Sequence, residues 1–164
     1  MTRSANEVMS LSSKAARGAG APPEQAALFG RAALCHLAAA REAETLRRAL
    51  EALPGGPILS LPPAFIVLQE EAAEAPGAEL PAPAADPALI QSYAEAQPFL
   101  TTVIAASRRL TTDLNTPSPR LPAHRIALPK ELAERMQALA ARLLVPDTAA
   151  SRLGGAGAGL TDND

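Results

Sequence analysis

The stretch Lys14-Ala-Ala-Arg-Gly-Ala-Gly20 lies between two segments that carry the apolar spacing of helices, and it decides the fold of the N-terminal part of the chain. Ser4 precedes Glu7 by three residues, which is the spacing of a capping box, so we predict that the first helix begins there. Gly18 and Gly20 tolerate the backbone conformations that end a helix. The stretch is therefore predicted to be the turn between two helices.

The segment after this turn has its own helical signals. Pro22-Pro23 suits the first turn of a helix. One face of that helix is predicted to be apolar and small enough for close packing, and it consists of Ala26, Phe29, Gly30, Ala33 and Leu37. The apolar phase changes near Arg41–Ala43, which indicates a kink or a new helix. We predict an N-terminal helical hairpin from Ser4 to Leu53.

The middle of the chain is rich in proline. Ile58–Leu61 is predicted to be a short extended piece and Ala64–Ala75 a helix. Four prolines with alanines make residues 76–87 a predicted surface loop. Asp86-Pro87 then has the pattern of a helix start.

The C-terminal half is predicted to be helical with one small hairpin. A helical face is expected from Phe99, Leu100, Val103, Ile104 and Leu110. Thr111–Leu114 is predicted to pair with His124–Leu128 as an antiparallel hairpin across the turn residues Asn115–Pro119. Lys130–Val145 has the clearest helical periodicity, through Leu132, Met136, Leu139 and Leu143. The predicted fold class is mainly α, at most α+β, and the 164 residues suit a single domain.

Composition narrows the function classes. A net charge of −2 and a pI near 5.7 argue against nucleic acid as a partner, because nucleic-acid binding needs a basic face. The pair Arg108-Arg109 is predicted to be a solvated helix end. The single cysteine, Cys35, excludes a disulfide framework within the chain and fits a reducing compartment. No signal peptide and no membrane span of about 20 apolar residues is apparent, so we expect a soluble, cytoplasmic protein.

Catalytic and metal-binding patterns are missing from the sequence. Adjacent helical residues point about 100° apart, so Cys35 and His36 do not form a nucleophile–base pair, and we predict a buried cysteine beside a half-exposed histidine. The carboxylates of Glu70, Glu71 and Glu74 are predicted to form a solvated helix face. No cofactor and no metal is expected, and the pattern favours a protein that is not an enzyme.

The C-terminal tail, residues 154–164, is rich in glycine and ends in acidic residues. Three interpretations stay open. The tail is a flexible end, or it folds back on Arg17–Gly20, or it inserts into another protein or binds a hard cation through its terminal oxygens. The candidate binding residues are Lys14, Arg17, Gly18, Gly20, Arg152, Asp162 and Asp164.

Two stretches together resemble a known family. The N-terminal Asn6-Glu-Val with Lys14–Gly20, and the C-terminal Ser151-Arg-Leu-Gly-Gly-Ala-Gly-Ala-Gly-Leu-Thr-Asp-Asn-Asp164, are similar to a proteobacterial family of unknown function. Ala21-Pro22-Pro23 stands where that family tends to have a Trp-containing turn. The resemblance implies that the two ends meet in space, and it implies no activity or cofactor.

Two function classes remain. The first is a non-enzymatic accessory or interaction protein that binds a protein partner or a second copy of itself. The second is a small-molecule or anion-binding protein with a site between the Lys14–Gly20 turn and the tail.

Overall fold

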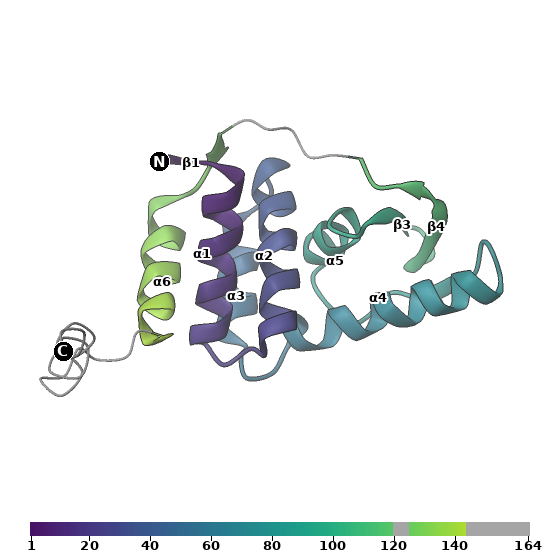
Figure 1. Cartoon of the computed structure of the whole chain (residues 1–164), viewed down its shortest axis with the longest axis horizontal. Helices are drawn as coiled ribbons and strands as arrows, with labels where there is room; N and C mark the ends of the chain where they lie inside the picture. Colours follow the sequence, from purple (N-terminus) through teal and green to yellow (C-terminus); the bar gives the residue numbers. More distant parts are fainter. Residues whose placement is uncertain (120–124, 144–164) are drawn as a thin grey trace, which may run out of the picture.

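The computed structural model describes residues 1–119 and 125–143, and its N-terminal helices begin where the local signals predict (Figure 1). Helix α1 spans Ala5–Gly18, and the capping box between Ser4 and Glu7 is present. Helix α2 spans Pro23–Ala38. The turn predicted for Lys14–Gly20 is shorter than expected, because α1 continues to Gly18. Gly20, at φ +107°, supplies the left-handed residue of the turn between the two helices.

Helix α1 lies between α2 and α6, which spans Lys130–Ala140 (Figure 1). Two glycines allow these helices to approach closely. A Cβ atom on Gly30 would lie 2.7 Å from the carbonyl oxygen of Met9, and one on Gly18 would lie 1.9 Å from the carbonyl oxygen of Leu139. Both glycines are therefore required by backbone packing on the two sides of α1.

The predicted hairpin consists of three helices. The phase change at Arg41–Ala43 separates α2 from α3, which spans Ala43–Glu51. Ala40 has φ +53° in the connection. The new-helix alternative is therefore the correct one.

Helix α4 spans Pro57–Glu74, so the predicted extended piece at Ile58–Leu61 is wrong. Pro57 occupies the first turn, where its missing N–H costs nothing. Pro62 and Pro63 lie inside the helix, and they leave two carbonyls of its first turns without amide partners. The helix predicted for Ala64–Ala75 is therefore correct in kind but begins seven residues, about two turns, earlier.

The larger sheet replaces the helical face predicted for residues 99–110. It has the antiparallel order β2-β4-β3, with β2 at Glu79–Pro81, β3 at Phe99–Ile104 and β4 at Arg109–Pro117. The apolar spacing in β3 fits a helix as well as a strand. The strand forms because Thr101–Ile104 are all β-branched, and β-branched residues favour strands. The predicted loop at 76–87 contains β2. The helix end predicted at Arg108-Arg109 is wrong, because Arg108 lies in the β3–β4 turn with φ +52° and Arg109 begins β4.

A second sheet pairs the two-residue strands β1, Thr2–Arg3, and β5, Ile126–Ala127. The predicted hairpin between Thr111–Leu114 and His124–Leu128 is therefore wrong in its pairing, although residues 111–114 are a strand. The β1–β5 contact brings the N-terminus beside the entry to α6.

The last two helices follow their predicted starts. Helix α5 spans Pro87–Glu95, and Asp86 Oδ1 accepts a hydrogen bond of 2.9 Å from the Ala88 amide. Helix α6 is followed by the 3-10 turn η1, Ala141–Leu143. Leu143 is 40% exposed instead of buried, and the predicted continuation to Val145 lies outside the described residues.

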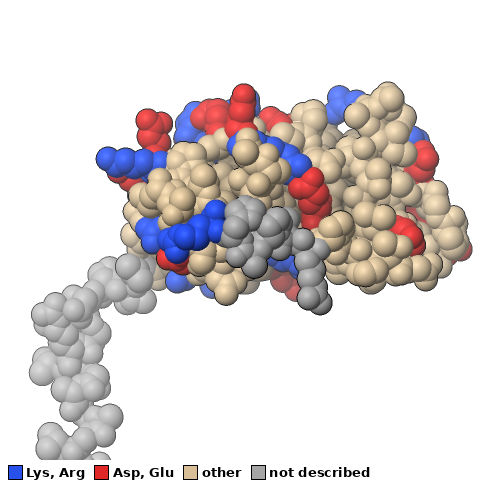
Figure 2. Space-filling model, turned by 90° about the horizontal axis from the view of Figure 1, so that it is seen from above, with Lys and Arg blue, Asp and Glu red and all other residues tan. Residues whose placement is uncertain are grey.

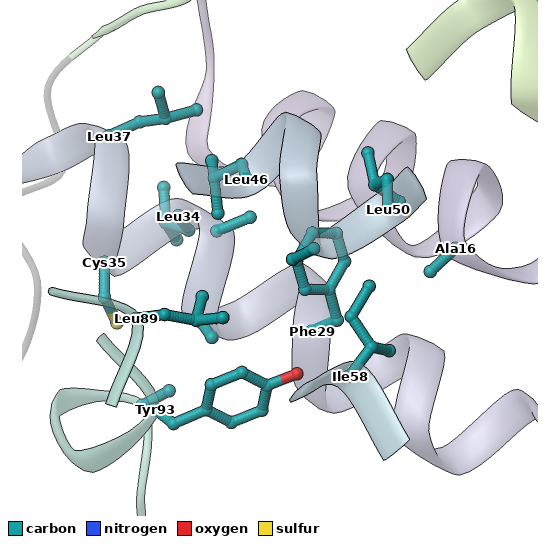
Figure 3. Close-up of a cluster of buried hydrophobic side chains, with 14 of the residues drawn as sticks. Ala16, Phe29, Leu34, Cys35, Leu37, Leu46, Leu50, Ile58, Leu89 and Tyr93 are labelled. Atoms are coloured by element: carbon teal, nitrogen blue, oxygen red, sulfur yellow. The ribbon is translucent and has the colours of Figure 1, made fainter. Parts of the chain in front are cut away.

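One hydrophobic cluster draws on all six helices. Phe29 of α2 lies near Ile58 of α4 and Leu50 of α3, and the Tyr93 hydroxyl points toward them (Figure 3). The Tyr93 ring stacks with Phe65 at a centroid distance of 6.2 Å. Helices account for 58% of the described residues and strands for 16%, which confirms the mainly α prediction.

Candidate functional site

The predicted basic residues of the N-terminal turn are exposed. Lys14 and Arg17 lie one turn apart on α1, and neither forms an ion pair with a side chain in the described part of the chain. Lys14 borders a shallow hollow of about 400 Å³ between α1 and α6, together with Arg3 and Gln137. The same hollow contains Glu7, whose carboxylate accepts a hydrogen bond from Arg3, so its charge is mixed.

The two glycines of the predicted site have structural explanations. Gly18 packs against the α6 backbone and Gly20 adopts positive φ. The other three predicted residues, Arg152, Asp162 and Asp164, lie outside the described residues. The structure therefore places Lys14 and Arg17 on one helix face and leaves the proposed contact with the tail as a prediction.

A buried polar network surrounds His36, which is fully buried instead of half-exposed. Its Nε2 lies 2.8 Å from the Glu42 carbonyl oxygen and its Nδ1 lies 2.9 Å from Ser92 Oγ. The Glu42 carbonyl can only accept, so Nε2 of the neutral ring carries the proton. The single proton of the Ser92 hydroxyl lies between two acceptors, the Nδ1 of His36 and the Ala88 carbonyl oxygen. The histidine thus joins α2, the α2–α3 connection and α5.

Charged groups complete this network at its rim. Arg41 donates to Glu95 at 2.8 and 2.5 Å and to Ser92 Oγ at 3.2 Å. Burial, opposed by the hydrogen bond to Glu42, lowers the pKa of His36. Burial also opposes ionisation of Glu95, but the hydrogen bonds from Arg41 and Gln91 outweigh it and hold the pKa of that carboxyl below its ordinary value.

The network has the chemical groups of a nucleophile–base pair but is buried away from any substrate. Ser92 and His36 both have no exposed surface. Ser92 Oγ also lies 2.6 Å from the Ala88 carbonyl oxygen within its own helix. Burial raises the pKa of the neighbouring Cys35 thiol to about 11, which disfavours the reactive thiolate. The arrangement holds helices together and does not support catalysis.

The outward side of α4 is the most unusual surface of the described chain. Ile66 is 55% exposed and Val67 is 45% exposed, on the side opposite the buried Phe65 and Leu68. We define the α4 outer face by these two residues with Pro63, Glu70 and Glu74, which share the same side at helical spacing. Ile66 and Val67 are adjacent, so their exposed parts form one small apolar patch on the helix.

The α4 outer face leads toward a hollow beside the sheet. Gln69 Nε2 donates to Gln97 Oε1 at 3.0 Å and fixes this flank of α4 against the segment that enters β3. The hollow has a volume of about 450 Å³ and lies between the end of α4 and strands β3 and β4. Its lining includes Ala73, seven residues after Ile66, and Leu100, which is 38% exposed. Helix α4 runs outward from the bundle below these strands (Figure 1).

Charge is distributed unevenly along the chain. Residues 49–107, which contain α4, α5, β2 and β3, include seven carboxylates and no Lys or Arg. Viewed from above, most of the blue side chains lie over the helical bundle, and the opposite end of the molecule, which contains the sheet, is largely tan with some red (Figure 2). Glu70, Glu71 and Glu74 form no ion pair with the described residues. The α4 outer face is therefore apolar toward the start of the helix and acidic toward its end.

Other classes of site lack support among residues 1–119 and 125–143. No group of three His, Cys, Asp or Glu side chains there could hold a metal ion. None of the helices described is long and apolar enough to cross a membrane. Comparison with protein-family models, curated proteins and solved structures found no match to this chain.

Sequence reasoning missed the α4 outer face, although a signal was present. The run Ala64–Leu68 is apolar without interruption, so this part of the helix is apolar on every side instead of along one stripe. A helix of that kind is normally surrounded by other structure. Its exposure in the fold marks a surface that neither the periodicity nor a motif could identify.

Proposed function

We propose that this chain is a non-enzymatic, cytoplasmic accessory protein that binds a protein partner through the α4 outer face. The observation that carries the proposal is the exposure of Ile66 and Val67 in the part of α4 that is apolar on every side, Ala64–Leu68. Covering these two half-exposed side chains would contribute about 2 kcal/mol to binding. The buried state of His36 and Cys35 adds support, because it removes the catalytic alternative at these residues.

Site-specific photo-crosslinking tests the proposal. A photoreactive amino acid replaces Val67 in one variant and the similarly exposed Leu143, at the end of η1, in the control. Irradiation in native lysate is expected to give a discrete protein adduct at position 67 and none at position 143. A second copy of the chain in the adduct would identify self-association. The same weak, diffuse adducts at both positions would contradict the proposal.

A second candidate is a small-molecule or anion-binding protein, with a site at the N-terminal turn. The observation that favours it is the exposure of Lys14 and Arg17 one turn apart, with no carboxylate of the described residues paired to either. A thermal-shift screen with acids, phosphates and nucleotides tests it. A true ligand at 100 times its dissociation constant stabilises the fold by about 2.7 kcal/mol, and an equal loss of that shift is expected in Lys14→Gln and Arg17→Gln.

A further inference from the structure

We infer that the partner segment on the α4 outer face is a basic amphipathic helix, an inference that rests on the function proposed above. The face supplies two kinds of contact in line along one helix. Ile66 and Val67 offer an apolar area, and Glu70 and Glu74 follow at one and two turns. A partner helix that packs on this face places its apolar side on Ile66 and Val67. Its basic residues then lie beside Glu70 and Glu74.

The apolar part sets the shape of the occupant. Ile66, Val67 and Pro63 form a short ridge, and the hollow near Ala73 and Leu100 lies beside it. A helix can bury side chains at positions i, i+3, i+4 and i+7 along such a ridge-and-hollow surface. Both halves of the surface lie on regular elements, so it is formed before the partner arrives.

The charged part sets the chemistry of the occupant. Glu70, Glu71 and Glu74 lack basic partners among the described residues, and α4 itself contains no Lys or Arg. Docking a neutral or acidic segment would remove water from these carboxylates without compensation. Lys or Arg on the partner would provide charge-assisted hydrogen bonds instead and would speed association.

The same charges disfavour a second copy of the chain on this face. If two α4 helices crossed antiparallel at Ile66 and Val67, Glu70 of one would cover Pro63 of the other, which offers no donor. A parallel crossing would bring the carboxylates of both copies together. An anionic lipid surface is disfavoured by the same repulsion.

Fluorescence anisotropy with three labelled synthetic helical peptides tests the inference on the full chain. The first has leucines at helical spacing and lysines on its other side. The second has glutamate in place of each lysine, and the third has the residues of the first in shuffled order. We expect the first to bind most tightly, with affinity that falls as salt rises.

Two variants locate the binding and a third controls for net charge. Ile66→Ser with Val67→Ser is expected to weaken the first peptide at least tenfold. Glu70→Gln with Glu74→Gln is expected to weaken it several-fold. Glu24→Gln with Glu131→Gln makes the same change in charge at exposed positions on α2 and α6, and it is expected to leave the affinity unchanged.

The outcomes separate this inference from the proposed function. Equal binding of the lysine and glutamate peptides, reduced only by the apolar variant, would overturn the basic partner and leave a docking face. If the shuffled peptide bound as tightly as the first peptide, general charge attraction would explain the binding and the inference would be overturned. The same conclusion would follow if Glu24→Gln with Glu131→Gln weakened binding as much as Glu70→Gln with Glu74→Gln. No binding of any peptide would overturn it as well, while the adduct at position 67 would still decide the proposed function.

Discussion

Gly18→Ala tests whether this glycine serves packing rather than ligand binding. In an ordinary helix the change would stabilise the protein by about 0.5–1 kcal/mol. Here the added Cβ would lie 1.9 Å from the Leu139 carbonyl oxygen, which belongs to the backbone of α6. Because α6 would have to move by about 1.5 Å to restore an ordinary contact, an overpacking cost in the upper part of the usual range, about 2–3 kcal/mol, is expected. Subtracting the helix gain leaves a net destabilisation of about 1–2.5 kcal/mol.

The assay is urea denaturation of the wild type and the variant, followed by circular dichroism, with thermal melts in parallel. The Tm is expected to fall by about 2–10 °C, since each kcal/mol corresponds to about 2–4 °C at this chain length. Gly55→Ala is the matched control. The nearest atom to its Cβ would be the Ala52 carbonyl oxygen at 3.4 Å, an ordinary contact, so a change within about 0.5 kcal/mol is expected. A Gly18→Ala protein as stable as the wild type, or more stable, would refute the packing argument.

Two further predictions concern the buried polar groups. Tyr93→Phe removes a buried hydroxyl that has no hydrogen-bond partner in the described structure, so the free energy of unfolding is expected to rise by about 1 kcal/mol; a decrease in urea denaturation would contradict this. In the unfolded chain His36 takes up a proton near its ordinary pKa of about 6.5, whereas in the folded chain burial lowers that pKa. The neutral, buried His36 therefore contributes to the free energy of unfolding above about pH 6.5, and this contribution is lost as the pH falls. His36→Gln retains a donor toward the Glu42 carbonyl but does not titrate, so between pH 7.5 and 5.5 its stability is expected to fall less than that of the wild type, and parallel pH curves would rule out His36 as the cause.

Helix starts could be predicted from the sequence because their signals are local. Ser4 and Glu7 cap α1 through side chains only three residues apart, and Asp86 caps α5 by accepting from the amide two residues further along the chain. The sheet could not be predicted in the same way. Strand β3 follows a helical spacing as well as a strand spacing, and β1 has two residues whose partner, β5, lies more than 120 residues away.

The candidate surface was hidden from sequence reasoning for a related reason. The apolar run Ala64–Leu68 predicts a helix but does not indicate which side the core will cover. Packing against β4 and the bundle covers Phe65 and Leu68 and leaves Ile66 and Val67 outside. His36 was predicted to be half-exposed because Ser92, its buried partner, is 56 residues away in the sequence.

A quantitative pull-down from native lysate with mass spectrometry tests whether the α4 outer face binds a protein partner. The wild type is compared with Ile66→Ser plus Val67→Ser and with Leu143→Ser, an exposed apolar control away from α4. Thermal melts first establish that all three proteins are folded. We predict that at least one protein is recovered with both the wild type and Leu143→Ser. The recovered amount of that protein is expected to fall about tenfold or more with Ile66→Ser plus Val67→Ser. Recovery of the same proteins in the same amounts with all three would contradict it.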